Sequence, residues 1–232
     1  MRNIFYITLL LSLFLQSCSS NKYLKYIKSE KSSVNLKFFK SKGIIQIVEK
    51  ANKHYYNDSL SSVLSYRIDS ILRTDKLNYG ITDKIEIKNE RLEKIINDSI
   101  SSIFYKIILP PYKIDNIKIP RVIDSLLESR NQRFALAIQG FGYFYDKENT
   151  ILKKVKGTLV NFASMGFAGT PPITNQLSLS FIILDSKENE ISAYVSYSPI
   201  FKNPLDREKI KQNLDNILIG NIIEKKKKND RR

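Results

Sequence analysis

The stretch LSLSFIILDSKENEISAYVSYS, residues 177–198, contains two hydrophobic runs separated by a short polar segment. The runs LSLSFIILD, residues 177–185, and EISAYVSYS, residues 190–198, are rich in the β-branched and aromatic residues that strands favour. The residues SKENE between them are typical of a turn. The stretch therefore predicts a β-hairpin near the C-terminus.

Regular elements are also predicted on both sides of this hairpin. RFALAIQGFGYFYD, residues 133–146, has the composition of a strand, with two glycines that permit a bulge or a close approach. DREKIKQNLDNIL, residues 206–218, has apolar residues at helical spacing and Asp206 as an N-cap. Pro120 is well suited to be the first residue of a helix that precedes the strand.

The N-terminal half contains mostly helical spacing. Helical spacing is found at Ile44, Ile47, Val48 and Ala51 and again at 60–72 after a cap at Asn57 or Asp58, which predicts two helices or one bent helix. A short strand at 84–88 and a helix at 92–104, stopped by Pro110 and Pro111, are predicted next in the chain. The fold class that follows is α+β, with several amphipathic helices packed on a mixed or antiparallel sheet of about four strands that includes the C-terminal hairpin.

The pattern of the first residues, MRNIFYITLLLSLFLQS, predicts a targeting segment. The apolar run from Ile4 to Leu15 is too short for the roughly 20 residues of a membrane-spanning helix and has the length of the apolar region of a secretory signal. Leu15 and Ser17 precede Cys18, the only cysteine of the chain. This order resembles the lipobox of bacterial lipoproteins; an ordinary cleaved signal peptide and a short anchor are the alternatives.

The lipobox resemblance implies a defined mature N-terminus. Residues 1–17 would be removed, the Cys18 thiol would carry a diacylglyceryl group, and the new amine could be acylated. Two or three acyl chains make such anchoring effectively permanent. By analogy with the sorting rules of Gram-negative lipoproteins, the acid-free residues 19–23 after the cysteine favour the outer membrane and the side that faces the periplasm.

Positive charge lies mainly in two short segments. The chain has a net charge of +15, of which residues 19–42 contribute +6, residues 224–232 contribute +4 and residues 43–223 only +4. A nucleic-acid-binding protein needs a basic surface on the folded body, so this distribution argues against a nucleic-acid partner and favours solvated tails. The expected organisation is a signal peptide at 1–17, a lipidated cysteine and basic tether at 18–42, one α+β domain at 43–223 (helical to 112, then strand, hairpin and helix) and a basic tail at 224–232.

Motifs for catalysis, metals and cofactors are not found in the sequence. His54 is the only histidine and lies in a polar segment of helical character, so it is expected at the surface. One histidine without cysteine partners does not give the ligand spacing of a zinc site, and no G-x-S-x-G motif presents a nucleophilic serine. Gly140 and Gly142 lie within a predicted strand and do not start a dinucleotide-binding loop. We expect no enzyme activity, no metal and no cofactor.

The segment TLVNFASMGFAGTPPITN, residues 158–175, is unusually long and apolar for a connection. Phe162, Met165 and Phe167 give it an apolar surface, so they are candidates for contact with a partner protein or a membrane. The alternative is that the segment folds back over the sheet and these side chains belong to the core.

The order of elements over residues 113–220 resembles a known group of lipoproteins. RFALAIQGFGYF, a strand that ends in glycines, followed by the strand–turn–strand FIILDSKENEI, is similar to the curli-secretion and penicillin-binding-protein-activator type of outer-membrane lipoprotein. This resemblance implies an assembly or adaptor role without chemistry, with an envelope protein or a second copy of the chain as partner. The alternative is a periplasmic module that binds a small ligand such as a lipid or a cell-wall fragment.

Overall fold

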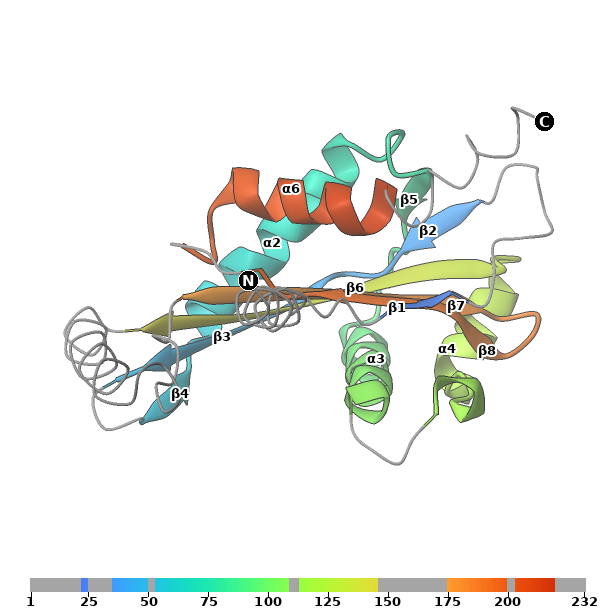
Figure 1. Ribbon diagram of the computed structural model, residues 1–232. Helices are drawn as coiled ribbons and strands as arrows, with labels where there is room; N and C mark the ends of the chain where they lie inside the picture. Colours follow the sequence, from blue (N-terminus) through green and yellow to red (C-terminus); the bar gives the residue numbers. More distant parts are fainter. Residues whose placement is uncertain are drawn as a thin grey trace, which may run out of the picture.

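Strand β6 (Phe134–Tyr145) lies at the centre of one mixed sheet that has helices on both faces (Figure 1). Along one edge, β6 pairs antiparallel with β7 (Gln176–Asp185), from Phe134 opposite Asp185 to Tyr143 opposite Gln176. The computed structural model describes residues 22–24, 35–49, 53–108, 113–145, 175–199 and 203–219.

The predicted C-terminal hairpin is confirmed. Strand β7 pairs antiparallel with β8 (Glu190–Tyr197), and the four residues between them form a turn. Asn189, the last turn residue, has a φ of 49°, a left-handed conformation that asparagine tolerates better than most residues. Strand β1 (Lys22–Leu24) then pairs antiparallel with β8 and extends the sheet on this side.

Two successive strands share the other edge of β6, and both are parallel to it. Strand β2 (Leu36–Phe38) pairs with the start of β6, and β3 (Lys42–Val48) pairs with its remaining length. Outside them, β5 (Ile81–Lys84) pairs parallel with β2, whereas β4 (His54–Tyr56) pairs antiparallel with β3. The outer edge of the sheet is therefore divided between two separate strands.

The described residues form eight strands, so the expected number of about four is too low. The additional strands are β3, at positions expected to be helical, and β1, β2 and β4, whose three residues each give little alternation to detect. Two of them, β1 and β2, lie within the range 18–42 that was expected to be a tether. The strand expected at 84–88 is instead β5, which ends at Lys84.

The helix expected around Ile44, Ile47 and Val48 is wrong, because these residues form strand β3. Five of its seven residues are Ile, Val or Gly, which suits a strand that packs close to a helix better than a helical segment. Ala51, the last residue of the expected face, lies outside the described residues.

Four helices cover the two faces of the sheet in the described part of the chain. Helices α2 (Asp58–Thr74) and α6 (Arg207–Leu218) lie on one face, and α3 (Glu90–Ile108) and α4 (Arg121–Ser129) lie on the other, above and below the sheet in Figure 1. A 3-10 helix, η2 (Ile114–Asn116), precedes α4. No helix among the described residues is long and apolar enough to cross a membrane.

The predicted caps of these helices are present. The Asn57 side chain accepts a hydrogen bond from the Leu60 N–H at 2.9 Å, and the Asp206 side chain accepts one from the Lys209 N–H at 3.1 Å. Each bond satisfies a backbone donor that has no partner inside the helix. Helix α4 begins at Arg121, one residue later than predicted, and Pro120 is its N-cap.

Each face of the sheet buries its own hydrophobic core. The core under α2 and α6 includes Leu64, Ile68 and Leu72 of α2, Ile210 and Leu214 of α6, and Leu136, Ile138, Leu179 and Phe181 of the sheet. The core under α3 and α4 includes Ile96, Ile100, Phe104, Ile123 and Leu127 of the helices, and Ala135, Ala137, Ile182 and Leu184 of the sheet. Adjacent sheet residues enter opposite cores, as the alternation of side chains along a strand requires.

Helix α2 also satisfies part of the open edge of the sheet. The N–H groups of Ser41, Gly43 and Ile45 donate hydrogen bonds to Asp69 Oδ1 (2.9 Å), Ser65 Oγ (2.7 Å) and Ser61 Oγ (2.8 Å), respectively. These donors are two residues apart in the chain, and the acceptors are four residues apart on α2. Two strand residues advance about 6.6 Å and four helix residues about 6 Å, so the two spacings match.

This close approach requires glycine at position 43. A Cβ atom there would lie 2.5 Å from the Ser61 carbonyl oxygen and 2.9 Å from the Ser65 backbone nitrogen. Because both atoms belong to the backbone of α2, a larger residue would push the helix away from the sheet edge.

Candidate functional site: the open end of the sheet

The helices α3 and α4 cover only part of their face of the sheet, and the end that contains β4 and the last residues of β6 extends beyond them (Figure 1). Gly140 and Gly142 alternate with Phe141, Tyr143 and Tyr145 along this part of β6. A Cβ atom on Gly140 would meet Leu64 and Ile68 of α2, so the glycines face α2. The three aromatic residues therefore project from the opposite face.

The aromatic side chains of β6 form a continuous row. The rings of Phe141 and Tyr143 are 4.8 Å apart between centroids and inclined by 73°, which is the edge-to-face geometry that aromatic pairs prefer. The rings of Tyr143 and Tyr145 are 6.2 Å apart. All three side chains are half-buried.

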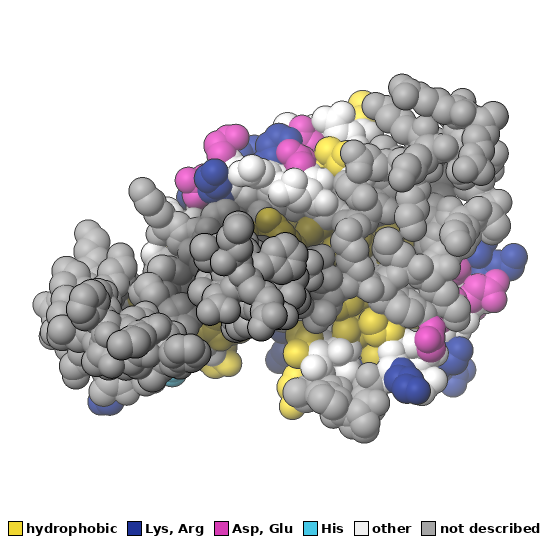
Figure 2. Space-filling model, viewed as in Figure 1, with side chains coloured by type: hydrophobic (Ala, Val, Ile, Leu, Met, Phe, Trp, Pro, Cys, Tyr) yellow, Lys and Arg dark blue, Asp and Glu magenta, His cyan; other side chains and the backbone are white. Residues whose placement is uncertain are grey.

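Strand β4 adds the exposed Tyr56 to this row, whereas its neighbour Tyr55 projects from the opposite face of the sheet. Gln46 of β3 lies opposite both Tyr56 of β4 and Tyr143 of β6, so these residues form one line across three strands. Tyr55 and Tyr56 are 44% and 66% exposed, respectively. Figure 2 shows hydrophobic side chains (yellow) beside the single histidine (cyan) at this end. We call Tyr56, Phe141, Tyr143 and Tyr145 the aromatic end of the sheet.

Paired serines lie between the aromatic end and the core under α3 and α4. Ser178 and Ser198 are hydrogen bonded at 2.6 Å, and the Ser180 hydroxyl donates to that of Ser196 at 2.8 Å. Phe141 lies opposite Ser178 in the sheet register. The same face of the sheet thus changes along the strands from a hydrophobic core to hydroxyl groups and then to aromatic rings.

Tyr143 and Tyr145 stay protonated and neutral, because their pKa values are raised. Burial raises the pKa of Tyr143, and the neighbouring Tyr56 raises it further. Burial also raises the pKa of Tyr145, with a contribution from Tyr143. Neutral rings with hydroxyl groups can pack on an apolar partner and donate hydrogen bonds at their edges.

His54 is exposed at the surface, as expected, but it lies in strand β4 and not in a helical segment. In the part of the chain that the structure describes, no group of three or more His, Cys, Asp or Glu side chains could hold a metal ion.

The residues predicted for lipid attachment and partner contact, Cys18, Phe162, Met165 and Phe167, lie outside the described residues. The described residues that flank the range containing the latter three are Tyr145 and Asn175, and the Tyr145 N–H donates to Asn175 Oδ1 at 2.9 Å. These two flanking residues therefore lie at the aromatic end of the sheet.

Sequence reasoning did not identify the aromatic end itself. The alternating residues GFGYFY, 140–145, were a usable signal, because glycine on one face and aromatic rings on the other indicate two different environments. The pairing of Tyr56 with this row depends on β4, which is too short to be predicted.

No family model matches this chain, and no curated protein matches it. Among solved structures, it is similar to a PelC dodecamer from Paraburkholderia phytofirmans, with 8% identity, a TM-score of 0.38, and coverage of 87% of this chain and 96% of that chain. It is also similar to the LpoB C-terminal domain from Salmonella enterica, with 8% identity, a TM-score of 0.29, and coverage of 75% of this chain and 87% of that chain. At these TM-scores, the likeness shows neither a shared fold nor a shared function, and the resemblance noted for residues 113–220 stays a prediction.

Proposed function

We propose that this protein is a non-enzymatic, lipid-anchored component of the bacterial cell envelope that binds a partner protein through the aromatic end of its sheet. The observation that carries the proposal is the row from Tyr56 through Tyr143, with Phe141 and Tyr145 beside it, on a sheet face that no described helix covers. Tyrosine and phenylalanine are enriched at the centres of protein interfaces.

The shape and the polarity of this surface favour a protein partner over a small ligand. Small ligands require concave sites that enclose most of their surface, whereas a sheet face with rings in a row is flat. The serine pairs Ser178–Ser198 and Ser180–Ser196 beside the rings supply hydroxyl groups of the kind found around the apolar centre of an interface. The partner is another envelope protein or a second copy of this chain.

The lipid anchor is supported by the pattern that ends at Cys18, and the sheet then limits how far the domain reaches from the membrane. Lys22, the first residue of β1, follows Cys18 by four positions. Four extended residues span at most about 14 Å. A lipidated Cys18 would thus hold the edge formed by β1 and β8 close to the membrane surface.

The proposal can be tested with a photo-crosslinking amino acid at position 56 of the full chain, expressed in a native envelope. Position 66 on α2 is the matched control, because Tyr66 is 74% exposed and lies on the other face of the sheet. We expect one crosslinked protein, identified by mass spectrometry, from position 56 and not from position 66. Equal crosslinking from both positions, or none from either, would contradict the proposal.

A second measurement tests the energetic contribution of Tyr56 to that complex. Replacing Tyr56 with Ser removes the exposed ring of the row, and a central aromatic residue contributes about 2 kcal/mol or more, roughly a 30-fold change in affinity. The control replaces Tyr66, which is 74% exposed on α2, with Ser. The Tyr56→Ser variant should lose the partner and the Tyr66→Ser variant should keep it, with the same thermal stability in both.

A further inference from the structure

A groove separate from the aromatic end lies where β2 and β5 finish. These neighbouring strands are parallel, with Phe38 opposite Lys84, so their carboxyl ends meet at one place. Lys84 is the last residue of β5, and Lys40 follows β2 by two positions. In open sheets flanked by helices, ligands bind outside the carboxyl ends of parallel strands.

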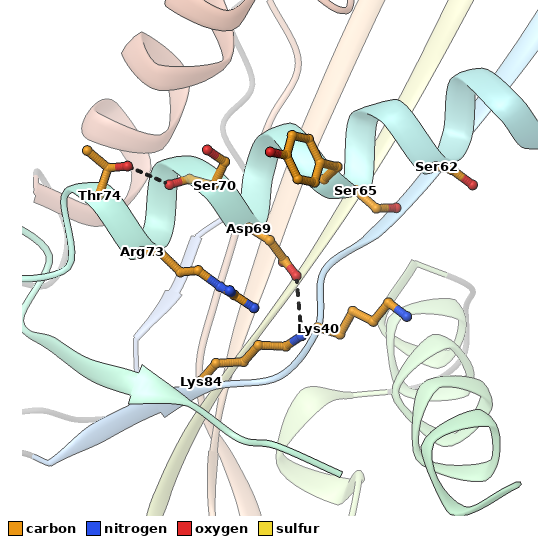
Figure 3. Close-up of a pocket in the computed structure, with 9 residues that line it drawn as sticks. Lys40, Ser62, Ser65, Asp69, Ser70, Arg73, Thr74 and Lys84 are labelled. Atoms are coloured by element: carbon orange, nitrogen blue, oxygen red, sulfur yellow. Dashed lines mark hydrogen bonds and ion pairs between the residues drawn. The ribbon is translucent and has the colours of Figure 1, made fainter. Parts of the chain in front are cut away.

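The division of the sheet edge creates this groove. Strand β5 continues the edge outside β2, and β4 continues it outside β3, so no described strand lies on the outer side of residues 39–41. Helix α2 crosses the gap and supplies Asp69 and Arg73 from successive turns. The resulting hollow has a volume of about 620 Å³, and α2 also lines it with the hydroxyl groups of Ser62, Ser70 and Thr74 (Figure 3).

A fixed carboxylate holds one of the cations in the groove. Asp69 Oδ2 lies 3.8 Å from the Lys84 ammonium, and its Oδ1 accepts the Ser41 N–H at 2.9 Å. The side chains of Lys84 and Asp69 are only 15% and 13% exposed. Both oxygens of Asp69 are therefore engaged, and Lys84 is held at the base of the groove.

Arg73 adds a positive charge that the ion pair between Asp69 and Lys84 does not neutralise. Its guanidinium points from α2 toward Asp69 and Lys84 in Figure 3, and its positive charge acts on Asp69. It makes no hydrogen bond or ion pair with another residue of the described ranges, and its side chain is exposed. A guanidinium offers five donors in a planar fork that fits the oxygen atoms of phosphate and carboxylate groups.

Lys40 supplies a third cation that a ligand can recruit. It extends toward α3, where its ammonium lies 3.3 Å from Glu93, and the two side chains are 49% and 27% exposed (Figure 3). Exposed ion pairs of this kind contribute little to stability, so a bound anion can displace Glu93 at small cost. Together, Lys40, Arg73, Lys84, Asp69 and Glu93 carry a net charge of +1.

We infer that this groove binds a phosphate group, with Arg73 and Lys84 as its principal ligands and Lys40 as a third. The cations approach from α2, from β5 and from the connection after β2, and the hydroxyl groups of Ser70 and Thr74 line the same hollow. A phosphate group presents three or more oxygen atoms to donors in these different directions, whereas a carboxylate presents two. The inference is independent of the proposed partner at the aromatic end.

Two sources can present this chemistry: a soluble phosphoester and the headgroup of a phospholipid. The test uses the full lipidated chain in a neutral detergent, titrated with inorganic phosphate or with dihexanoylphosphatidylglycerol, a soluble short-chain phospholipid, and followed by the amide resonances of Lys40, Arg73 and Lys84. Both probes should shift these resonances in a saturable manner. Tighter binding of the phospholipid identifies the headgroup as the ligand, and equal or weaker binding identifies a soluble phosphoester.

Charge-matched variants show whether the site itself is responsible. Arg73→Gln removes a charge-assisted contact and should weaken the binding of either probe about tenfold. Arg91→Gln removes the same charge from an exposed position on α3 and should leave binding unchanged. The inference is overturned by the absence of a saturable shift in the wild-type chain, or by equal weakening in the two variants. Because Arg73 is exposed, neither change is expected to unfold the protein.

Discussion

The Tyr79 hydroxyl donates a 2.6 Å hydrogen bond to Asp215 and thereby joins the turn after α2 to helix α6. The Tyr79 side chain is fully buried, and burial together with Asp215 raises its pKa. Lys211 lies 3.1 Å from Asp215 and 3.4 Å from Asp75, so the same carboxylate is part of an ion-pair network between the two helices.

Replacing Tyr79 with Phe should lower the free energy of unfolding by about 1.5–3 kcal/mol, because a hydrogen bond to a charged acceptor is lost inside the protein. Urea unfolding followed by circular dichroism measures this change. Tyr66→Phe is the control, since the Tyr66 side chain is 74% exposed and should show no effect. Equal stability of the Tyr79→Phe variant and the wild type would show that the hydroxyl is not a structural link.

Replacing Ser65 with Ala should leave the Gly43 N–H without its acceptor at the sheet edge. An unsatisfied buried donor costs about 1–3 kcal/mol, so the urea midpoint should fall accordingly. Ser62→Ala provides a control on the same helix, because Ser62 is exposed and accepts none of the three N–H groups of this edge. Similar losses in both variants would indicate an effect of helix propensity and not of the sheet edge.

The contribution of Asp69 to stability should depend on pH. Burial raises the pKa of Asp69 above its ordinary value of 3.8, and this effect exceeds the opposing effects of Ser41, Lys84 and Arg73. Below the ordinary value, the carboxyl is neutral in both the folded and the unfolded chain. As the pH rises through the higher folded-state pKa, the buried group must ionise, and the stability that depends on its neutral form is lost.

Asp69→Asn removes this titration while keeping an oxygen that can accept the Ser41 N–H. Its urea midpoint relative to wild type should therefore rise between acidic and neutral pH, and the increase should level off once Asp69 is ionised. A relative midpoint that falls over the same range would mean that Lys84 and Arg73 lower the pKa of Asp69 more than burial raises it.

Replacing Cys18 with Ser should abolish lipidation, because serine has no thiol to accept the diacylglyceryl group. The expected product is an unprocessed precursor that retains residues 1–17 and is larger on a denaturing gel. Partition between detergent and water, together with metabolic labelling by a fatty acid, measures the change. Ser20→Ala should mature as the wild type does, and normal maturation of the Cys18→Ser chain would refute the anchor.

The long elements could be predicted from the sequence because each repeats its hydrophobic pattern several times. Helix α6 shows four apolar positions on one face after Asp206, and β7 and β8 have strand composition on both sides of a polar turn. The pattern of β3 favours a helix instead, because the two faces of the strand lie in different environments. Ile44, Ile47 and Val48 match helical spacing by coincidence. The alternation of buried residues at Gly43 and Ile45 does not appear in the hydrophobic pattern, because one of the two is glycine.

Neither candidate site could be predicted, because each depends on contacts between distant segments. The phosphate groove combines Lys40, Arg73 and Lys84, which come from three elements and whose charges are unremarkable in a lysine-rich chain. The aromatic end combines Tyr56 with Tyr143 only through the register of β3 between them. The segment at 158–175 lies almost wholly outside the described residues, so its role in partner contact stays a prediction.

The pairing of α2 with the sheet edge has a consequence for how this protein can diverge in sequence. Ser61, Ser65 and Asp69 stay aligned with Ile45, Gly43 and Ser41 only because two strand residues advance as far as four helix residues. A single insertion in either segment would turn the donors or acceptors on one side of the insertion away from their partners. In homologous proteins, insertions and deletions in these two segments are expected to occur together, two residues in the strand for about one turn of the helix.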